Sequence, residues 1–287
     1  MLKAWLTLAL GATLSLPMAA YAGCGRDAEE LSGGKCDLRG KDLKGADLGG
    51  QDFSRADLRD VDLRGAKLER TNFRGADLRG AKLDDARMEQ ADLRDAKLEK
   101  ASMKGARFER ADFRGAKLER AGMRDARGDK ANFRDARMER VELRGARLER
   151  ADFQGARLEQ ADLRDVRAAQ ANFRGARADR IVLRGARLER AVFKEARLER
   201  AELRDVRAEG ADFSRSKLRD ASFKDARLER ANFENAEARG ADFSGARLER
   251  TNFTRGQFKD AKMKDAKIRD IKCPDGGKGE KGCDWSK

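Results

Sequence analysis

The 287-residue chain has no histidine, only two prolines and a single tyrosine. The absence of histidine removes the commonest general base and metal ligand of enzymes. The sequence also has no glycine-rich phosphate loop and no nucleophile elbow. Carboxylates are plentiful, but pairs such as Asp84 and Asp85 recur at regular intervals, whereas a catalytic pair needs a dry, concave site. We therefore expect no catalytic residues, no metal site and no cofactor.

Long apolar runs are missing apart from one segment near the N-terminus. Residues 4–16 are apolar but too few to span a bilayer comfortably. Lys3 precedes them, and the small-x-small triplet 20–22 follows. This order predicts a secretory signal peptide over residues 1–22 and an exported protein, either periplasmic or secreted. The alternative is an N-terminal anchor that is retained.

Four cysteines occur, in two short-range pairs: Cys24 with Cys36, and Cys273 with Cys283. In an exported chain, an even number arranged in this way indicates two disulfides, one near each end. A competing interpretation concerns Cys24, because segment 21–24 resembles a bacterial lipobox, which would make the protein a lipoprotein anchored through that cysteine. A tyrosine stands where the motif usually has leucine, and lipidation would leave Cys36 without a partner.

Charge and a five-residue repeat are what the chain has in abundance. Charged residues make up 41% of it, against about 25% in ordinary domains, and such a composition favours disorder unless the apolar residues are patterned. They are patterned, because residues 36–270 divide into 47 quintets without an insertion. With quintet positions numbered 1 to 5, position 3 is Leu, Phe, Met or Ile in 42 quintets and position 1 is Ala in 35.

A spacing of five fits neither common secondary structure. On an α-helix it would spread the apolar residues around the whole circumference, and on a flat strand it would send successive ones to opposite faces. Positions 1 and 3 are two residues apart, however, so a short extended segment points both to the same side. A turn after each segment then predicts a chain that coils around an axis with five residues per side.

The phenylalanines predict how many sides one coil has. Ten of the 14 share a single phase of 20 residues: Phe53, Phe73, Phe113, Phe133, Phe153, Phe173, Phe193, Phe213, Phe233 and Phe253. A period of 20 means four quintets per coil, with the rings forming a core ladder at the spacing of paired strands, about 4.8 Å. The 47 quintets then predict about 12 coils.

Several quintets carry a family resemblance. Quintets 46–50 (ADLGG), 111–115 (ADFRG) and 131–135 (ANFRD) resemble the A-[DN]-[LF]-x-x consensus of the pentapeptide repeat proteins. The resemblance covers residues 36–270 and implies an all-β fold, a right-handed quadrilateral β-helix with positions 1 and 3 inside.

The flanking segments are interpreted as caps, because the open ends of such a solenoid expose strand edges. Residues 23–35 are the expected N-terminal cap, and residues 271–287 the expected disulfide-closed C-terminal cap. The alternative for the C-terminal segment is a homodimer interface that uses Trp285, since some members of the family dimerise through their terminal coils.

The repeat also has weak points. Lys41 and Gln51 occupy position 1, so the first coils are expected to be the least regular. Position 3 is small at Gly128, Ala168, Ala178, Ala208 and Ala238. Each of these five could mark a pocket, but we expect larger neighbours in adjacent coils to fill the space.

The net charge of +14 lies on alternate quintets. Quintets centred on residues 43, 53 and so on to 263 sum to zero, whereas those centred on residues 38, 48 and so on to 268 sum to +13. In a four-quintet coil, alternate quintets form two opposite sides. Their typical unit is ARLER, as at residues 146–150, 186–190 and 226–230.

Arginine on these sides suits phosphate or carboxylate, because its guanidinium group can bind in a bidentate fork. The candidate anion-binding residues are Arg147, Arg150, Arg187, Arg190, Arg227 and Arg230. Candidate partners are anionic lipid, lipopolysaccharide and anionic glycans. Nucleic acid is not expected, because no aromatic side chains are interleaved to stack on bases. The alternative is a solvated, salt-bridged surface that keeps the rod soluble.

These observations predict a non-catalytic, exported scaffold or interaction protein. The family resemblance implies a second function, which is protection of DNA gyrase by mimicry of DNA. Members with that function are acidic and cytoplasmic. This chain is basic, begins with a signal-peptide pattern and has no loop between its quintets, and each of these features disfavours the second function.

Overall fold

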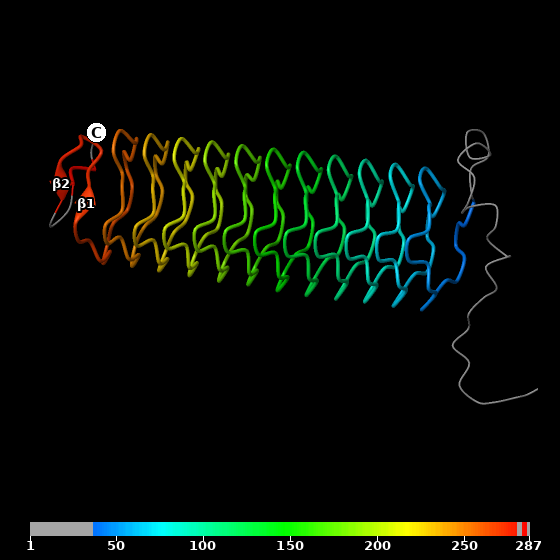
Figure 1. The fold of residues 1–287 in the computed structure, drawn as a ribbon. Helices are drawn as coiled ribbons and strands as arrows, with labels where there is room; N and C mark the ends of the chain where they lie inside the picture. Colours follow the sequence, from blue (N-terminus) through cyan, green and yellow to red (C-terminus); the bar gives the residue numbers. More distant parts are fainter. Residues whose placement is uncertain (1–36, 280–282, 286–287) are drawn as a thin grey trace, which may run out of the picture.

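A computed structural model describes residues 37–279 and 283–285 and shows an elongated rod of stacked coils (Figure 1). The chain advances along the rod in sequence order, so each coil lies beside the coils that precede and follow it. No described residue is helical, and each quintet up to residue 265 contributes one bridging residue and, two positions later, a two-residue turn. The chain therefore folds as a repeat β-helix solenoid.

Several predictions fall on residues outside the described ranges. They are the signal peptide over residues 1–22, the N-terminal cap over residues 23–35, and both interpretations of Cys24 and Cys36. Within the described ranges, no helix has the length and apolar character needed to cross a bilayer.

Parallel bridges connect each coil to the next. They join residues 20 apart in sequence, from Asp37 with Asp57 to Asn252 with Lys272. The 20-residue spacing predicted from the phenylalanines is thereby confirmed. Every side chain consequently lies beside the side chain that occupies the same quintet position one coil later.

Backbone hydrogen bonds account for four of the five N–H groups in a typical quintet. In quintet 71–75, the N–H of Asn72 donates to the previous coil (2.9 Å), while those of Phe73 and Gly75 donate to the next coil (2.7 and 2.8 Å). The N–H of Thr71 donates to the carbonyl three residues earlier (3.2 Å) and closes the turn between quintets. Only the N–H at position 4 has no backbone acceptor.

Where position 2 holds Asp or Asn, its side chain satisfies this remaining N–H group. The Asn72 Oδ1 atom accepts from the N–H of Arg74 (3.0 Å), and Asp162 Oδ1 accepts from the N–H of Arg164 (3.1 Å). A short side chain with a carbonyl or carboxylate oxygen is required at this distance, as in other Asx turns. This is why Asp and Asn are frequent at position 2.

Position 5 has a positive φ in every quintet from Gly40 to Asp270, between 53° and 72°. A positive φ at the third residue of a four-residue turn is typical of type II turns and favours glycine. Nevertheless, 32 of the 47 positions hold another residue, so the bonds to adjacent coils must outweigh the local strain. Gly145 has a second constraint, because a Cβ atom there would lie 2.5 Å from Asp125 Oδ1, one coil earlier.

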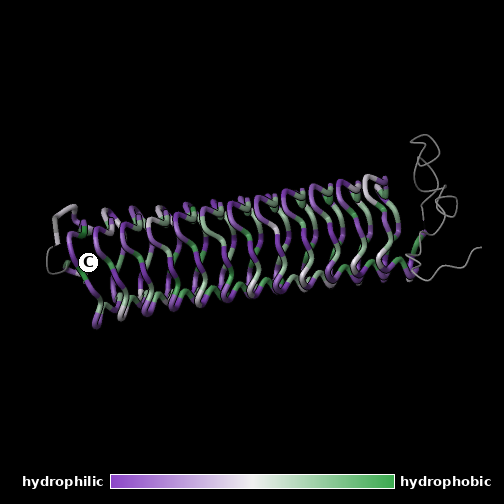
Figure 2. Tube along the Cα trace, turned by 60° about the horizontal axis from the view of Figure 1, so that its bottom comes forward, coloured by the Kyte–Doolittle hydropathy of each residue, from purple (hydrophilic) through white to green (hydrophobic). Residues whose placement is uncertain are grey.

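Positions 1 and 3 form one continuous core. Between Ala56 and Leu248 every residue at these positions is buried, and Figure 2 shows the resulting alternation of hydrophobic and hydrophilic residues around each coil. The predicted Phe ladder is present as parallel stacked rings. Neighbouring centroids from Phe153 to Phe193 are 4.7 Å apart, with interplanar angles of 1–3°.

The small residue at position 3 of one quintet, Gly128, is compensated by a neighbour, as expected. Gly128 has no side chain because the ring of Phe108, one coil earlier, occupies its space, and a Cβ on Gly128 would overlap that ring. The four small alanines at position 3 are also fully buried or nearly so: Ala168, Ala178, Ala208 and Ala238.

The first described coil fits its prediction only in part. Its backbone bridges are as regular as those of later coils, so the expected irregularity does not extend to the backbone pairing. Burial does decline here, because Lys41 is exposed and Gln51 is half-buried. Backbone pairing does not depend on the polarity of position 1, whereas burial does.

The C-terminal end has a different local structure. Strand β1 (Ile271–Lys272) pairs antiparallel with strand β2 (Lys278–Gly279). The predicted disulfide between Cys273 and Cys283 is present. Its loop places Trp285 edge-on against Phe253, with ring centroids 5.3 Å apart. Trp285 therefore covers the last ring of the Phe ladder.

The packing of Phe108 over Gly128 can be tested by a double-mutant cycle. Gly128→Ala is expected to destabilise the protein by about 1–3 kcal/mol, because the new methyl group overlaps the ring. Phe108→Leu combined with Gly128→Ala should recover most of this loss, because Leu148 and Ala168 already form such a pair. Urea unfolding followed by circular dichroism measures all three variants, and additive losses in the double variant would contradict the packing.

The contact of Trp285 is expected to depend on the disulfide. In a Trp5→Phe background Trp285 is the only tryptophan, and reduction with dithiothreitol should shift its emission to the red as the indole leaves the Phe ladder. A Cys273→Ser/Cys283→Ser variant serves as the control and should show no response to the reductant. An unchanged spectrum after reduction of the parent would rule out this dependence.

Candidate anion-binding surface

Positive charge is distributed unevenly along the rod. Residues 36–95 carry 13 Lys and Arg against 14 Asp and Glu, whereas residues 96–270 carry 46 against 32. The excess of cations thus begins near Lys97. Position 2 accounts for much of the change, because it is mostly Asp in the first coils and mostly Arg or Lys on two sides of the later ones.

One uninterrupted row of arginines occupies position 2 along one side, and we name it the first cationic column. Each member bridges to the next one, 20 residues later: Arg87, Arg107, Arg127, Arg147, Arg167, Arg187, Arg207, Arg227 and Arg247. Lys67 and Lys267 extend the row at its two ends. Position 2 lies between two inward-pointing positions of an extended segment, so its side chain points outward. The arginines are exposed and repeat at about 4.8 Å.

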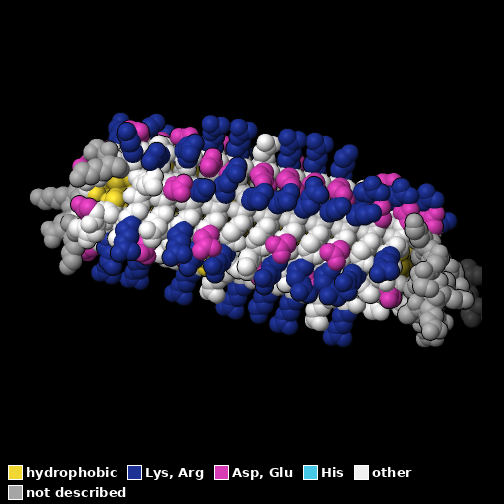
Figure 3. All heavy atoms as spheres, turned by 90° about the horizontal axis from the view of Figure 1, so that it is seen from above, with side chains coloured by type: hydrophobic (Ala, Val, Ile, Leu, Met, Phe, Trp, Pro, Cys, Tyr) yellow, Lys and Arg dark blue, Asp and Glu magenta, His cyan; other side chains and the backbone are white. Residues whose placement is uncertain are grey.

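A second cationic column lies half a coil, or ten residues, away from the first. Its members also bridge in series: Lys97, Lys117, Arg137, Arg157, Arg177, Arg197 and Lys217. Figure 3 shows Lys and Arg along both long edges of the rod, with Asp and Glu interspersed. Two sets of cations therefore extend parallel to the rod axis.

Carboxylates at position 4 neutralise only part of the first column. Arg87 pairs with Glu69 (2.9 Å), Arg107 with Glu89 (3.0 Å) and Arg147 with Asp129 (2.7 Å). Within the described ranges, the other six arginines have no carboxylate oxygen within 4.0 Å: Arg127, Arg167, Arg187, Arg207, Arg227 and Arg247. Five of these follow one another in consecutive coils. Their guanidinium groups remain available to an external anion.

The position 4 glutamates of the same two sides are themselves incompletely paired. Eight of them have a buried Oε2 atom with no hydrogen-bond donor among the described residues: Glu89, Glu99, Glu109, Glu119, Glu139, Glu159, Glu209 and Glu229. One carboxylate oxygen thus points into each wall and only the other remains available at the surface. In Glu89 and Glu119 this second oxygen pairs with Arg107 and Arg137.

The first coils show the opposite arrangement. Asp62 at position 2 accepts two hydrogen bonds from the guanidinium of Arg64 at position 4, of 2.8 and 2.6 Å. These bonds, followed by the Arg64 backbone N–H and by Lys44, hold the pKa of Asp62 well below its usual range. Arg39 lowers the pKa of Asp37 to about 2 through the same contact. Arginines at position 4 are therefore already occupied wherever Asp stands at position 2.

The structure brings the six predicted arginines together on the side of the first column. Arg187 and Arg227 are members without an ion pair, whereas Arg147 contacts both Asp129 and Glu149 (2.7 and 3.6 Å). The other three lie at position 5 of the same quintets: Arg150, Arg190 and Arg230.

Sequence reasoning placed the excess charge on two opposite sides, but all six of its candidate residues lie on one of them. The second column was therefore not among the candidates, although reading every twentieth residue from Lys97 would have found it. Among the described residues, no group of three or more His, Cys, Asp or Glu side chains could hold a metal ion.

A family model described as pentapeptide repeats matches successive segments that together extend from residue 35 to residue 270. The chain belongs to the pentapeptide repeat family. No curated protein matches the sequence. The Asx turn at position 2 and the inward positions 1 and 3 thus give the physical reason for the family's consensus in this chain.

Several solved structures of pentapeptide repeat proteins are similar. HetL of the cyanobacterium Nostoc, involved in regulation of heterocyst differentiation, is 24% identical with a TM-score of 0.42, and the match covers 87% of this chain and 96% of that one. QnrB1, a plasmid-mediated fluoroquinolone resistance protein, is 17% identical with a TM-score of 0.33 over 81% and 91%. A thylakoid lumen protein of Arabidopsis thaliana is 30% identical with a TM-score of 0.16 over 50% and 79%.

The Asp–Arg pairs of the first coils predict a dependence of stability on pH. A carboxylate with a depressed folded-state pKa contributes stability above its unfolded value, near 4, and loses it as pH falls through the folded value. Asp62→Asn keeps the turn acceptor, as Asn72 does, but removes the titrating group. The melting temperature of the parent should exceed that of the variant at pH 7, and the difference should shrink below about pH 4. Thermal unfolding from pH 7 to pH 2 measures it, and a constant difference would contradict the pairing.

Proposed function

We propose that this pentapeptide repeat protein is a non-catalytic, exported interaction scaffold that binds a linear polyanion of the cell envelope through its cationic columns. The observation that carries the proposal is the first cationic column, nine arginines in consecutive coils, of which six have no ion pair among the described residues. The proposal includes the shape that the family resemblance implies. This shape is a right-handed, four-sided β-helix of about 12 coils.

The backbone ladder pre-organises the column for binding. It holds like charges at about 4.8 Å, so the arginines repel one another until an anion or counterions screen them. Guanidinium groups form charge-assisted, bidentate hydrogen bonds with carboxylate, sulfate and phosphate oxygens. A linear polyanion that lies along the rod would release counterions at each coil, and its affinity would fall steeply with salt.

Two features support export. The N-terminal pattern of residues 1–22 is typical of a signal peptide, and the disulfide between Cys273 and Cys283 is a bond that persists in oxidising compartments. Lipoprotein anchoring through Cys24 would hold the same scaffold at a membrane. Anionic lipid, lipopolysaccharide and anionic glycans are the polyanions such a location offers.

Nucleic acid fits the surface less well. Single strands are bound by exposed aromatic rings on which bases stack, but every phenylalanine of the described coils is buried in the core. The basic columns also have the sign opposite to that needed for mimicry of DNA.

Removing three consecutive unpaired arginines tests the proposal. Arg187→Gln, Arg207→Gln and Arg227→Gln together should weaken binding to lipopolysaccharide or heparin about tenfold at low salt, because three charge-assisted contacts are lost. The matched control is Arg144→Gln, Arg184→Gln and Arg204→Gln, which removes the same charge from position 4 of a neighbouring side in similar coils. The control should weaken binding much less.

Binding is measured across a salt series, with anionic and neutral vesicles as further arms. Absence of binding by the unmodified protein to any polyanion at low salt would refute the proposal. Equal losses in the two triple variants would show that net charge alone is responsible and that the column is not the binding surface.

A further inference from the structure

A third row of side chains lies beside the first cationic column, at position 5 of the same quintets, and we name it the corner row. It contains Gln90, Arg110, Lys130, Arg150, Gln170, Arg190, Gly210, Arg230 and Arg250. Its side chains extend along the rod axis toward the next coil, because Arg150 Nε donates to Gln170 Oε1 one coil later (3.1 Å). Arg140 makes the same contact with Gln160 on the opposite side (2.9 Å). Arg150 and Arg140 are thus directed at the residue that stands at position 5 of the next coil.

Gly210 interrupts this row, and it is the only glycine between Gln90 and Arg250 in the row. The side chain of Arg190 passes over it, with Cγ 3.7 Å from the place where a Cβ would stand. Where Gln170 supplies an acceptor to Arg150, Gly210 supplies none to Arg190. Neither Arg190 nor Arg230 has a side-chain hydrogen bond or ion pair within the described ranges.

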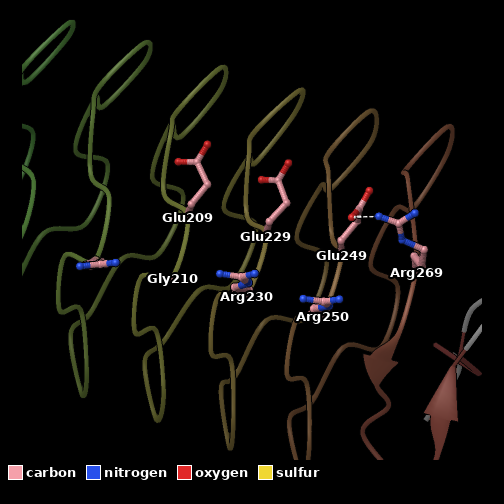
Figure 4. Close-up of a pocket in the computed structure, with 8 residues that line it drawn as sticks. Glu209, Gly210, Glu229, Arg230, Glu249, Arg250 and Arg269 are labelled. Carbon is pink, nitrogen blue, oxygen red and sulfur yellow. Dashed lines mark hydrogen bonds and ion pairs between the residues drawn. The ribbon is translucent and has the colours of Figure 1, made fainter.

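The interruption lies at one end of a hollow of about 490 Å³, which continues past Arg230 and Arg250 to Arg269 and is within the size range of small-molecule sites. Figure 4 shows two rows facing it: Glu209, Glu229 and Glu249 in one wall, and the corner row in the other. Arg269 closes one end and pairs with Glu249.

The hollow presents donors and acceptors side by side. Arg190, Arg230 and Arg250 supply unpaired guanidinium groups. Glu209 and Glu229 each bury Oε2 without a donor, which leaves Oε1 as the accessible, unpaired acceptor. A ligand that fits must therefore carry both an acidic group and hydrogen-bond donors. A sugar residue with a carboxylate or sulfate meets this requirement, because its acidic group accepts from arginine and its hydroxyl groups donate to glutamate. A bare chain of phosphates has no donor for the glutamates.

We propose that the hollow over Gly210 binds one acidic sugar residue of an anionic polysaccharide lying along the rod, between Arg190 and Arg230. This inference rests on the proposed function and narrows it to one class of polyanion. Arginine repeats at every coil of the first column from Arg87 to Arg247, which by itself gives a bound chain no preferred register. Gly210 supplies one, because it is the one position of the corner row between Gln90 and Arg250 that has no side chain.

Gly210→Arg gives an experiment in which charge and shape predict opposite results. The substitution restores the side chain that the row carries in neighbouring coils, and Arg190 and Arg230 already have a similar φ (57° and 61°, against 67° at Gly210), so the fold should tolerate it. It adds one positive charge to the binding side but fills the hollow. The matched control is Gly175→Arg, which adds the same charge on the side of the Phe ladder, where a Cβ would meet no atom within 4 Å.

Dissociation constants are measured by calorimetry at fixed low ionic strength, with size-defined oligogalacturonate and inorganic polyphosphate as probes, and circular dichroism checks the folding of both variants. Gly210→Arg should weaken oligogalacturonate binding about tenfold, because the contacts with Arg190 and Glu209 are blocked. It should leave polyphosphate binding unchanged or slightly tighter. Gly175→Arg should match the unmodified protein with both probes.

Each other outcome has a distinct meaning. If Gly210→Arg binds oligogalacturonate as tightly as Gly175→Arg does, the hollow is not a site, while the proposed function stands. If it weakens both probes equally, the hollow binds an acidic group without recognising a sugar, and the assignment to polysaccharide is wrong. If the unmodified protein binds neither probe nor vesicles at low salt, the proposed function itself fails.

Discussion

The backbone hydrogen bonds between successive coils are the interaction on which every other feature depends. They fix each residue beside the one 20 positions later, from Asp37 onward, and the repeat therefore converts a one-dimensional pattern into columns. Apolar residues become a continuous core, phenylalanines become a ladder of parallel rings, and arginines become rows of like charge. The turns show the strength of the constraint, because most positions with a positive φ are occupied by residues other than glycine.

Most of the fold could be predicted from the sequence. The alternation of positions 1 and 3 defined the buried side of each segment, and the phase of residues such as Phe153 and Phe173 gave the length of a coil. These predictions succeed because one period governs the whole chain, so 47 quintets report the same geometry independently. The family consensus then acquires a physical reason, since Asp or Asn at position 2 satisfies the one backbone N–H group that the coils leave unpaired.

The candidate site was predictable only as a region. Sequence alone placed Arg147, Arg187 and Arg227 on a common side. In the structure Arg147 forms an ion pair with Asp129, whereas Arg187 and Arg227 have no ion pair among the described residues. Side-chain pairing depends on rotamers and on which carboxylate lies one coil earlier, and neither follows from a repeat consensus. Filling of the space at Gly128 by a larger neighbour was expected. The hollow beside Gly210 was not expected, because its walls combine side chains from several successive coils.

The 20-residue register also restricts how such a chain can change its length. Loss or gain of a single quintet would keep every turn and every buried position, yet it would rotate all downstream residues by a quarter of a coil. The arginines beyond the change would then lie on the neighbouring side of the coil, in line with quintets that hold Asp or Asn at position 2 and Phe at position 3. Each cationic row would end at the point of the change. A change of two quintets would instead join the first column to the second, which lies half a coil away. The cationic rows therefore tolerate a change in length of half a coil or of a whole coil, but not of one pentapeptide.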